Sequence, residues 1–133
     1  MRNRCPDCFQ GCIDYRGVLA NEILADKITV LSGIRMFRRS KDLVDVYALT
    51  HCVKVLTIDI FEIIESKHLE LGKFAEFMTR RDDVGHAYTK LQGVEGKPPF
   101  EDVYLYLTKL IYPFALRDRT PRTWDYKNQV WTD

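Results

Sequence analysis

The feature that most constrains the fold is the stretch from Phe37 to Leu49, FRRSKDLVDVYAL, which has the pattern of a helix with apolar residues on almost every side. Two aspartates, Asp42 and Asp45, stand three residues apart within it, and their neighbours leave no obviously hydrated face for both carboxylates. Removing a charge from water is costly unless that charge is paired. We therefore ask which positively charged residue these two aspartates face.

The composition is that of an ordinary soluble globular protein, with 133 residues of which 46% are hydrophobic and 29% charged. The formal net charge of +1 gives no bulk electrostatic argument for nucleic-acid binding. No apolar run approaches the roughly 20 residues that a membrane span requires. The first residues, MRNRCPDCFQGC, also lack the apolar stretch of a secretory signal. We expect a single domain in the cytoplasm with no membrane partner.

The cysteines allow two interpretations. Cys5, Cys8 and Cys12 form a C-x2-C-x3-C cluster, and Cys52 lies far along the chain beside His51. A C-x2-C pair is a common half of a zinc site, so a complete site would combine Cys5, Cys8, Cys12 and Cys52, or replace one of them with a histidine. The simpler interpretation is a set of reduced thiols in a mobile N-terminal segment.

Helical periodicity dominates the rest of the chain. The first helix is expected from an Asn21 N-cap to Gly33, and the second from a Ser40 N-cap to about Thr50 or Cys52. Further helices are expected from Thr57 or Asp59, over 69–80, over 82–92 and over 100–114, the last ending at Pro113. The sequence therefore predicts a mainly α fold, a single bundle of about five to six helices.

The chain divides into three segments on these grounds. Residues 1–20 form an N-terminal segment with the cysteine cluster, and within it Gly11–Leu19 is the one candidate for a short strand. Residues 21–116 form the helical domain. Residues 117–133 form a polar tail with two tryptophans, which we expect to lie over the bundle.

Lys27 is the second unusual residue, because Ile23, Lys27 and Leu31 are spaced i, i+4 and i+8 and so share one stripe of the first helix. A short connection predicts that the first two helices are antiparallel neighbours, in which an inward Lys27 would meet Asp42 and Asp45. The two sets of unusual residues would then neutralise each other.

This arrangement has a structural and a functional interpretation. Asp42 lies in the first turn of its helix, where the helix dipole favours a negative charge, whereas Asp45 lies beyond that turn and is the more informative residue. A buried pair with lysine can be purely structural. Together with Arg38, Arg39 and Lys41, the same residues would offer several cations to a phosphate and a carboxylate to orient them.

Three motifs carry a resemblance to a known family. They are A-D-K-x-x-x-L from Ala25 to Leu31, R-R-x-K-D-L-x-D-x-Y from Arg38 to Tyr47, and P-x-F-E-D-V-Y with its apolar helix from Pro98 to Pro113. In order and spacing they resemble the C-terminal helical half of the abortive-infection AbiE-type (AbiEii) nucleotidyltransferase toxins. The similarity covers about Asn21 to Leu116, which is most of the chain.

The resemblance implies nucleotide transfer. In this family an N-terminal half supplies a small sheet whose G-S motif and D-x-D carboxylates bind the metal, so NTP and Mg would be the cofactors. The helical half contributes a lysine that reaches the nucleotide phosphates, here Lys27, and an aspartate that shapes the pocket, here Asp42 or Asp45. Arg38, Arg39 and Lys41 would add positive potential at its rim. The implied partners are an N-terminal half, an antitoxin and an RNA acceptor such as a tRNA end.

The chain departs from the family pattern in one respect, because it contains no G-S dipeptide and no D-x-D sequence. The metal-binding half, which makes phosphoryl transfer fast, is therefore missing from these residues. We expect a truncated product, one half of a split enzyme or a degenerate relative, and no nucleotide transfer by this chain alone.

Two further functions come from other classes of protein. Arg81 and His86, in RDDVGH, fit the R-x4-6-H spacing of helical HEPN-type ribonucleases, where a histidine would handle the proton of the 2′-hydroxyl. The other alternative is a helical protein-interaction module without catalysis, which self-associates through an apolar patch that includes Tyr15, Val18 and Leu19. Trp124 and Trp131 could contribute to such an interface.

Overall fold

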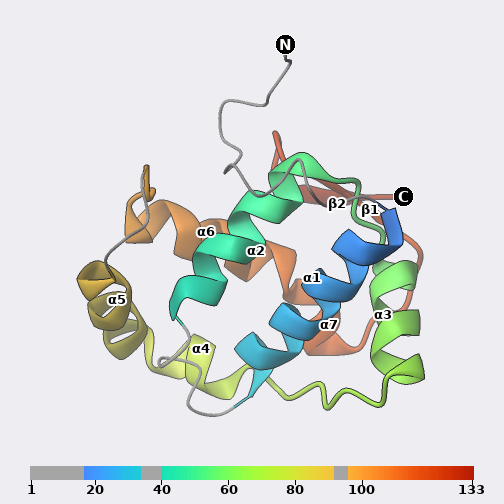
Figure 1. Cartoon of the computed structure of the whole chain (residues 1–133), viewed down its shortest axis with the longest axis horizontal. Coiled ribbons are helices and arrows are strands. Elements are labelled where there is room, and N and C mark those ends of the chain that lie inside the picture. Colours follow the sequence, from blue (N-terminus) through green and yellow to red (C-terminus); the bar gives the residue numbers. More distant parts are fainter. Residues whose placement is uncertain (1–16, 34–39, 92–95) are drawn as a thin grey trace.

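Two antiparallel helices lie at the centre of the fold. The computed structural model describes residues 17–33, 40–91 and 96–133. Helix α1 (Gly17–Ser32) and helix α2 (Ser40–Cys52) lie side by side and run in opposite directions, as Figure 1 shows. The antiparallel pair that the sequence predicts is therefore present.

The remaining elements surround this pair. In the described residues they are α3 (Thr57–Ser66), α4 (Ala75–Thr79), α5 (Arg81–Lys90), α6 (Phe100–Leu110), α7 (Tyr112–Leu116), β1 (Thr123–Asp125) and β2 (Val130–Thr132). Helices α3 and α4 pack on α1, whereas α5 and α6 pack on α2 (Figure 1). The fold is mainly helical, as predicted, with five longer helices and two of five residues in the described part of the chain. None of these described helices has the length and apolarity to cross a bilayer.

Helix α2 is buried on most of its sides, which explains why its sequence has no polar face. Its side chains Leu43, Val46 and Leu49 are 0–3% exposed. They meet Leu24 and Ile28 of α1 within the same apolar core. Full burial of such a side chain contributes about 1.5–3 kcal/mol to folding, so this layer accounts for much of the association between the two helices.

Helix α1 begins earlier than the sequence predicts. It starts at Gly17, so Asn21 lies inside the helix and does not cap it. Ala20 is completely buried one turn before Leu24, which extends the buried stripe of the helix toward the N-terminus. The expected strand over Gly11–Leu19 is therefore wrong for Gly17–Leu19, which are helical, while residues 11–16 lie outside the described part of the chain.

Helix α4 is shorter than the helix predicted over 69–80, because the preceding residues are bound to the end of α1. The amide of Gly72 donates to Ser32 Oγ at 2.7 Å, and the amide of Phe74 donates to the Ser32 carbonyl oxygen at 3.1 Å. A Cβ atom on Gly72 would lie 2.2 Å from that carbonyl oxygen, so the approach requires glycine. Phe74, with φ of 59°, then turns the chain into α4.

The helix predicted over 100–114 divides into α6 and α7. Helix α6 ends at Leu110, and Pro113 lies in the first turn of α7 instead of ending a helix. Proline is well tolerated in a first turn, where its missing N–H is not needed. The prediction that Pro113 ends the long helix is therefore wrong.

The tail packs over the bundle as predicted, but it does so as a hairpin. Strands β1 and β2 are antiparallel, with Trp124 opposite Trp131. The amide of Trp124 donates to the Val55 carbonyl oxygen at 2.9 Å, which joins the hairpin to the segment between α2 and α3. The strands of the described residues thus lie near the C-terminus. They are only three residues long, too short to show alternation in the sequence.

Candidate functional site

Lys27 of α1 lies between the two aspartates of α2. Its Nζ atom is 2.8 Å from Asp42 Oδ1 and 3.0 Å from Asp45 Oδ2. The side chain of Asp42 is 5% exposed, whereas those of Lys27 and Asp45 are 20% and 25% exposed. The predicted contact between the lysine and the aspartates is confirmed, and it forms at the edge of the α1–α2 interface with one side open to solvent.

Lys41 extends this group on the solvent side. Its Nζ atom is 2.9 Å from Asp45 Oδ1, and its side chain is 63% exposed. Asp45 therefore uses one carboxylate oxygen for Lys27 and the other for Lys41. We call Lys27, Lys41, Asp42 and Asp45 the Lys–Asp cluster. Its two ammonium groups and two carboxylates cancel in formal charge.

The Lys–Asp cluster keeps Lys27 protonated. Burial alone lowers the pKa of its ammonium group, but the hydrogen bonds to Asp42 and Asp45 and the charges of both carboxylates outweigh that effect. The pKa of Lys27 is therefore raised above the ordinary lysine value.

Several predicted site residues lie outside the described part of the chain. These are Arg38 and Arg39, together with Cys5, Cys8 and Cys12. Cys52, the last residue of α2, is described and is disulfide-bonded, and a cysteine in a disulfide offers no thiolate to zinc. Within the described residues, no group of three or more histidine, cysteine and acidic side chains could hold a metal ion. The zinc site stays a prediction.

The ribonuclease residues do not converge on one point. Arg81 makes an ion pair with Glu101 and stacks over the ring of Tyr104 at 5.2 Å, while His86 is exposed on α5. Residues five apart on a helix point about 140° away from each other. The helix predicted to be weak at Gly85 nevertheless forms, because the ring of Phe100 packs where a Cβ atom would lie. The ribonuclease alternative stays a prediction, and Arg81 and His86 do not form a joint site in the structure.

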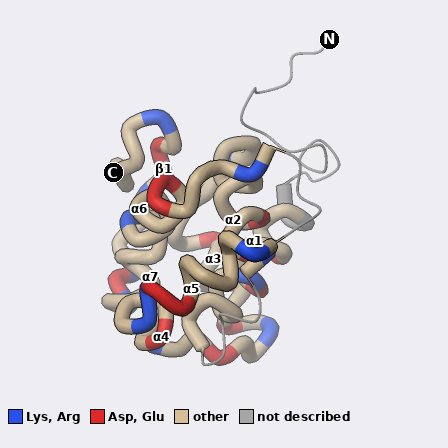
Figure 2. The backbone as a smooth tube through the Cα atoms, turned by 90° about the vertical axis from the view of Figure 1, so that its left-hand side faces the viewer, with Lys and Arg blue, Asp and Glu red and all other residues tan. Residues whose placement is uncertain are grey.

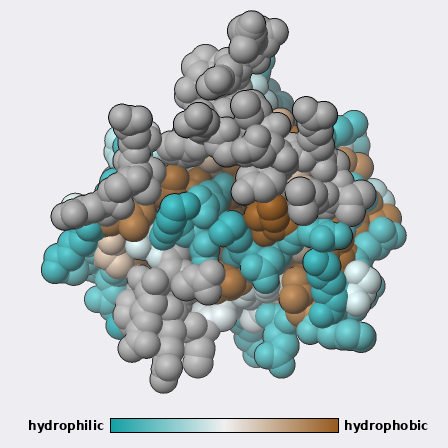
Figure 3. Space-filling view, in the orientation of Figure 1, coloured by the Kyte–Doolittle hydropathy of each residue, from teal (hydrophilic) through white to brown (hydrophobic). Residues whose placement is uncertain are grey.

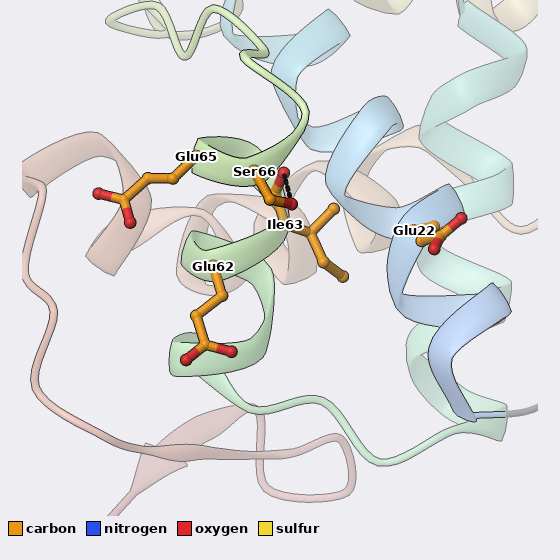
Figure 4. Close-up of a pocket in the computed structure, with 5 residues that line it drawn as sticks. All are labelled: Glu22, Glu62, Ile63, Glu65 and Ser66. Atoms are coloured by element: carbon orange, nitrogen blue, oxygen red, sulfur yellow. Dashed lines mark hydrogen bonds between the residues drawn. The ribbon is translucent and has the colours of Figure 1, made fainter.

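A wide-open hollow between α1 and α3 contains none of the predicted residues. It has a volume of about 620 Å³ and is lined by Glu22, Glu62, Ile63, Glu65 and Ser66 (Figure 4). The glutamates Glu22 and Glu65 form ion pairs with Lys67 and Arg119 on the surface. Three carboxylates around one hollow disfavour phosphate, so this surface does not compete with the Lys–Asp cluster as an anion site.

Helix α2 carries a second polar group, which no pattern in the sequence indicated. Thr50 Oγ1 and the Tyr106 hydroxyl share a hydrogen bond of 2.7 Å, and Trp124 Nε1 donates to the same hydroxyl at 2.8 Å. His51 stacks on Tyr106 with ring centroids 4.8 Å apart. The available signals were the threonine and histidine that end an apolar helix and the tryptophan in a polar tail, but neither signal identified its partner.

The surface of the described residues is mixed in charge and hydropathy. Lysine and arginine residues are interspersed with aspartate and glutamate residues along the chain (Figure 2). On the face shown in Figure 3, the apolar areas are separated by hydrophilic residues.

Comparison of the chain with family models, with curated proteins and with solved structures found no match. The resemblance to the AbiE-type toxins therefore depends on the residues and spacings of this sequence, and the cluster geometry is an independent observation beside it.

Proposed function

We propose that this chain is the nucleotide-phosphate-binding helical half of an AbiE-type nucleotidyltransferase and that it is inactive alone. Lys27 would contact the phosphates of the nucleotide, and Asp42 and Asp45 would form the adjacent wall of the pocket. Arg38, Arg39 and Lys41 would add positive potential at the rim. An antitoxin and an RNA acceptor are further partners that only the resemblance suggests.

One observation carries this proposal. The resemblance selects a lysine and two aspartates that are distant in sequence, and Lys27 contacts both aspartates in the folded chain. A protonated lysine at the edge of a helix interface, partly shielded from water, is a group that binds phosphate strongly. Lys41 lies beside the Asp45 carboxylate, so the group offers two ammonium groups to a phosphate and a carboxylate to orient them.

The chemistry of transfer would need residues that this chain does not supply. The D-x-D carboxylates of the missing half would hold a divalent metal, which would supply the Lewis-acid chemistry of the transfer. The residues of this chain would instead hold and orient the phosphates at Lys27, while the packing of α1 against α2 limits access of water to the ammonium group. The metal-binding half would have to come from another segment or polypeptide.

The direct test combines the chain with a polypeptide that carries the G-S and D-x-D motifs, encoded beside it, and measures incorporation of labelled nucleotide into RNA. We expect activity with both polypeptides, none with either alone, and loss of activity in Lys27→Ala. Lys109→Ala is the matched control, because Lys109 is exposed on α6 and its ammonium group donates a hydrogen bond to the neutral Gln129 side chain. Equal activity of the Lys27→Ala and Lys109→Ala variants would refute the phosphate role of Lys27.

A second candidate, a self-associating interaction module, is favoured by a separate observation. Three large apolar side chains of α6 and α7 are exposed, namely Leu105 at 56%, Tyr112 at 63% and Leu116 at 57%. Contiguous apolar patches often belong to an interface, and these three side chains are the candidates for one in α6 and α7. Tyr15 lies outside the described residues, and the side chains of Val18 and Leu19 are not described, so they add nothing to this surface. Light scattering would show a dimer that Leu105→Ser weakens, whereas a monomer at every concentration would contradict it.

A further inference from the structure

Asp45 occupies a position between two ammonium groups from different helices. Its Oδ2 atom faces Lys27 of α1 at 3.0 Å, and its Oδ1 atom faces Lys41 of α2 at 2.9 Å. A carboxylate held in this way accepts charge-assisted hydrogen bonds through both oxygens, which is also how a phosphate group is held. The side chain thus resembles a bound anion in a site formed by the two lysines.

We propose that the Asp45 carboxylate is a built-in competitor that occupies the phosphate site of Lys27 and Lys41 until a phosphate group displaces it. This inference rests on the proposed function and adds the regulation of the same site. The chain alone would then bind phosphate weakly because its own carboxylate must first leave. The ligand class is a terminal phosphate or polyphosphate, whose several anionic oxygens outnumber those of a single carboxylate.

The two aspartates of α2 are not equivalent in this respect. The Asp42 side chain is 5% exposed and lies in the first turn of α2, where the helix dipole stabilises its charge, so it has little reason to leave. The Asp45 side chain is 25% exposed and lies past that turn, so it can rotate toward water at small cost. Asp42 thus anchors Lys27, and Asp45 is the carboxylate that exchanges.

Lys41 has the freedom that this exchange requires. It is 63% exposed, and in the described structure it contacts Asp45 only, so no second carboxylate holds it in place. Lys27 keeps Asp42 when Asp45 leaves, which fixes its ammonium group at 2.8 Å from Asp42 Oδ1. One fixed and one mobile ammonium group can then close on a phosphate from two sides.

The size of the effect follows from the population of the open site. If Asp45 closes the site for about nine-tenths of the time, its removal raises the apparent affinity about tenfold, because apparent affinity scales with the competent fraction. Asp45→Asn keeps the shape of the side chain and removes its charge. The gain should disappear when Lys41 is also replaced, since the second ammonium group is then missing.

The experiment is isothermal titration calorimetry of the whole chain with inorganic triphosphate and, separately, with ATP. The proteins are the wild type, Asp45→Asn, Asp45→Asn/Lys41→Gln and Asp83→Asn. Asp83 of α5 is the matched control, since its replacement removes the same charge from an ion pair, here with Arg80, the residue before that helix. Asp45→Ser replaces Asp45→Asn if the latter does not melt cooperatively.

We expect Asp45→Asn to bind triphosphate about tenfold more tightly than the wild type. Asp83→Asn should show no such gain, and the gain should be lost in Asp45→Asn/Lys41→Gln. Equal binding by the wild type and Asp45→Asn, or a gain that survives Lys41→Gln, would overturn the inference. The two proposals fail separately. ATP binding by the wild type that requires Lys27 but does not tighten in Asp45→Asn refutes only the competitor role. Tighter triphosphate binding without any preference for ATP supports the competitor role and counts against the nucleotide function.

Discussion

The polar groups at the two ends of α2 are paired in different ways. At the N-terminal end, the Lys–Asp cluster pairs charged groups that keep 5–63% of their side-chain surface exposed. At the C-terminal end, Thr50, Tyr106 and Trp124 form a neutral network whose members are 0–6% exposed. The first region is open and charged, and the second is closed and uncharged.

This difference separates a region that can exchange partners from one that cannot. In the neutral network, the Tyr106 hydroxyl is shared by Thr50 and Trp124, and burial raises the pKa of that hydroxyl, which therefore stays protonated. Any ligand would have to break buried hydrogen bonds to enter. In the Lys–Asp cluster, a ligand only has to replace the Asp45 carboxylate, whose side chain is 25% exposed, and so function is expected at this end of the helix.

Removal of the central ammonium group should produce the largest effect on stability. Lys27→Met keeps the apolar stem but withdraws the positive charge from Asp42, which is 5% exposed, and we expect a loss of about 3 kcal/mol in the free energy of unfolding. Urea unfolding with the Lys109→Met control measures this loss. The double variant Lys27→Met/Asp42→Asn should recover part of it, and a double variant that is less stable than both single variants would contradict the account.

Removal of the Tyr106 hydroxyl should lower the free energy of unfolding somewhat less than Lys27→Met does. Tyr106→Phe leaves the buried Trp124 indole N–H without its acceptor, so we expect a loss of about 2 kcal/mol in the free energy of unfolding. Tyr112→Phe removes a hydroxyl from a side chain that is 63% exposed and should change stability by less than about 0.5 kcal/mol. A Tyr106→Phe variant as stable as Tyr112→Phe would show that the network does not hold the hairpin on the bundle.

Alkaline pH should reduce the stabilisation that the Lys–Asp cluster gives to the fold, by less than the loss expected for Lys27→Met. Because the folded-state pKa of Lys27 is raised, its contribution is fully present below the ordinary lysine pKa of about 10.4 and is lost as the pH rises through the folded value. The deficit of Lys27→Met relative to the wild type should therefore stay constant up to about pH 10.4 and shrink as the pH rises above that value.

The ionisation of buried tyrosines does not affect the difference in stability between the wild type and Lys27→Met. Burial raises the pKa of Tyr88 to about 12 and that of Tyr106 as well, so both also reduce stability as the pH rises above the ordinary tyrosine value. Both tyrosines are present in the wild type and in Lys27→Met, and their contribution cancels in the difference between the two. A deficit that stays constant through this pH range would mean that the Lys27 charge does not stabilise the fold.

The same comparison shows what the sequence can and cannot predict. Contact of Lys27 with Asp42 and Asp45 was predictable from the sequence. Lys27 lies on an apolar stripe of its helix, and the two aspartates have no hydrated face on theirs. A short connection makes the two helices neighbours. Thr50 and Tyr106 are 56 residues apart, and no local pattern joins residues at that separation. The neutral network therefore becomes visible only in the folded chain.

The errors in the helix boundaries have a related cause. The end of α1 binds the chain at Gly72 and Phe74, and this tertiary contact overrides the helical pattern of residues 69–74. Pro113 does not end the long helix, because α6 already ends at Leu110 and the proline falls in the first turn of α7. Periodicity thus predicted that the helices exist, and packing determined where they begin and end.

Lys41 should make the smallest contribution to stability, and this distinguishes exchange from anchoring within the cluster. Its ion pair with Asp45 spans four residues of one helix and is largely exposed, so Lys41→Gln should cost only about 0.3–0.5 kcal/mol. Thermal melting at low and at high salt measures this cost, which should vanish at high salt because exposed charges are screened. A loss above about 1 kcal/mol that persists in salt would mean that Lys41 is an anchor like Asp42. A small, salt-sensitive loss leaves Lys41 free to exchange Asp45 for a phosphate without unfolding the helix pair.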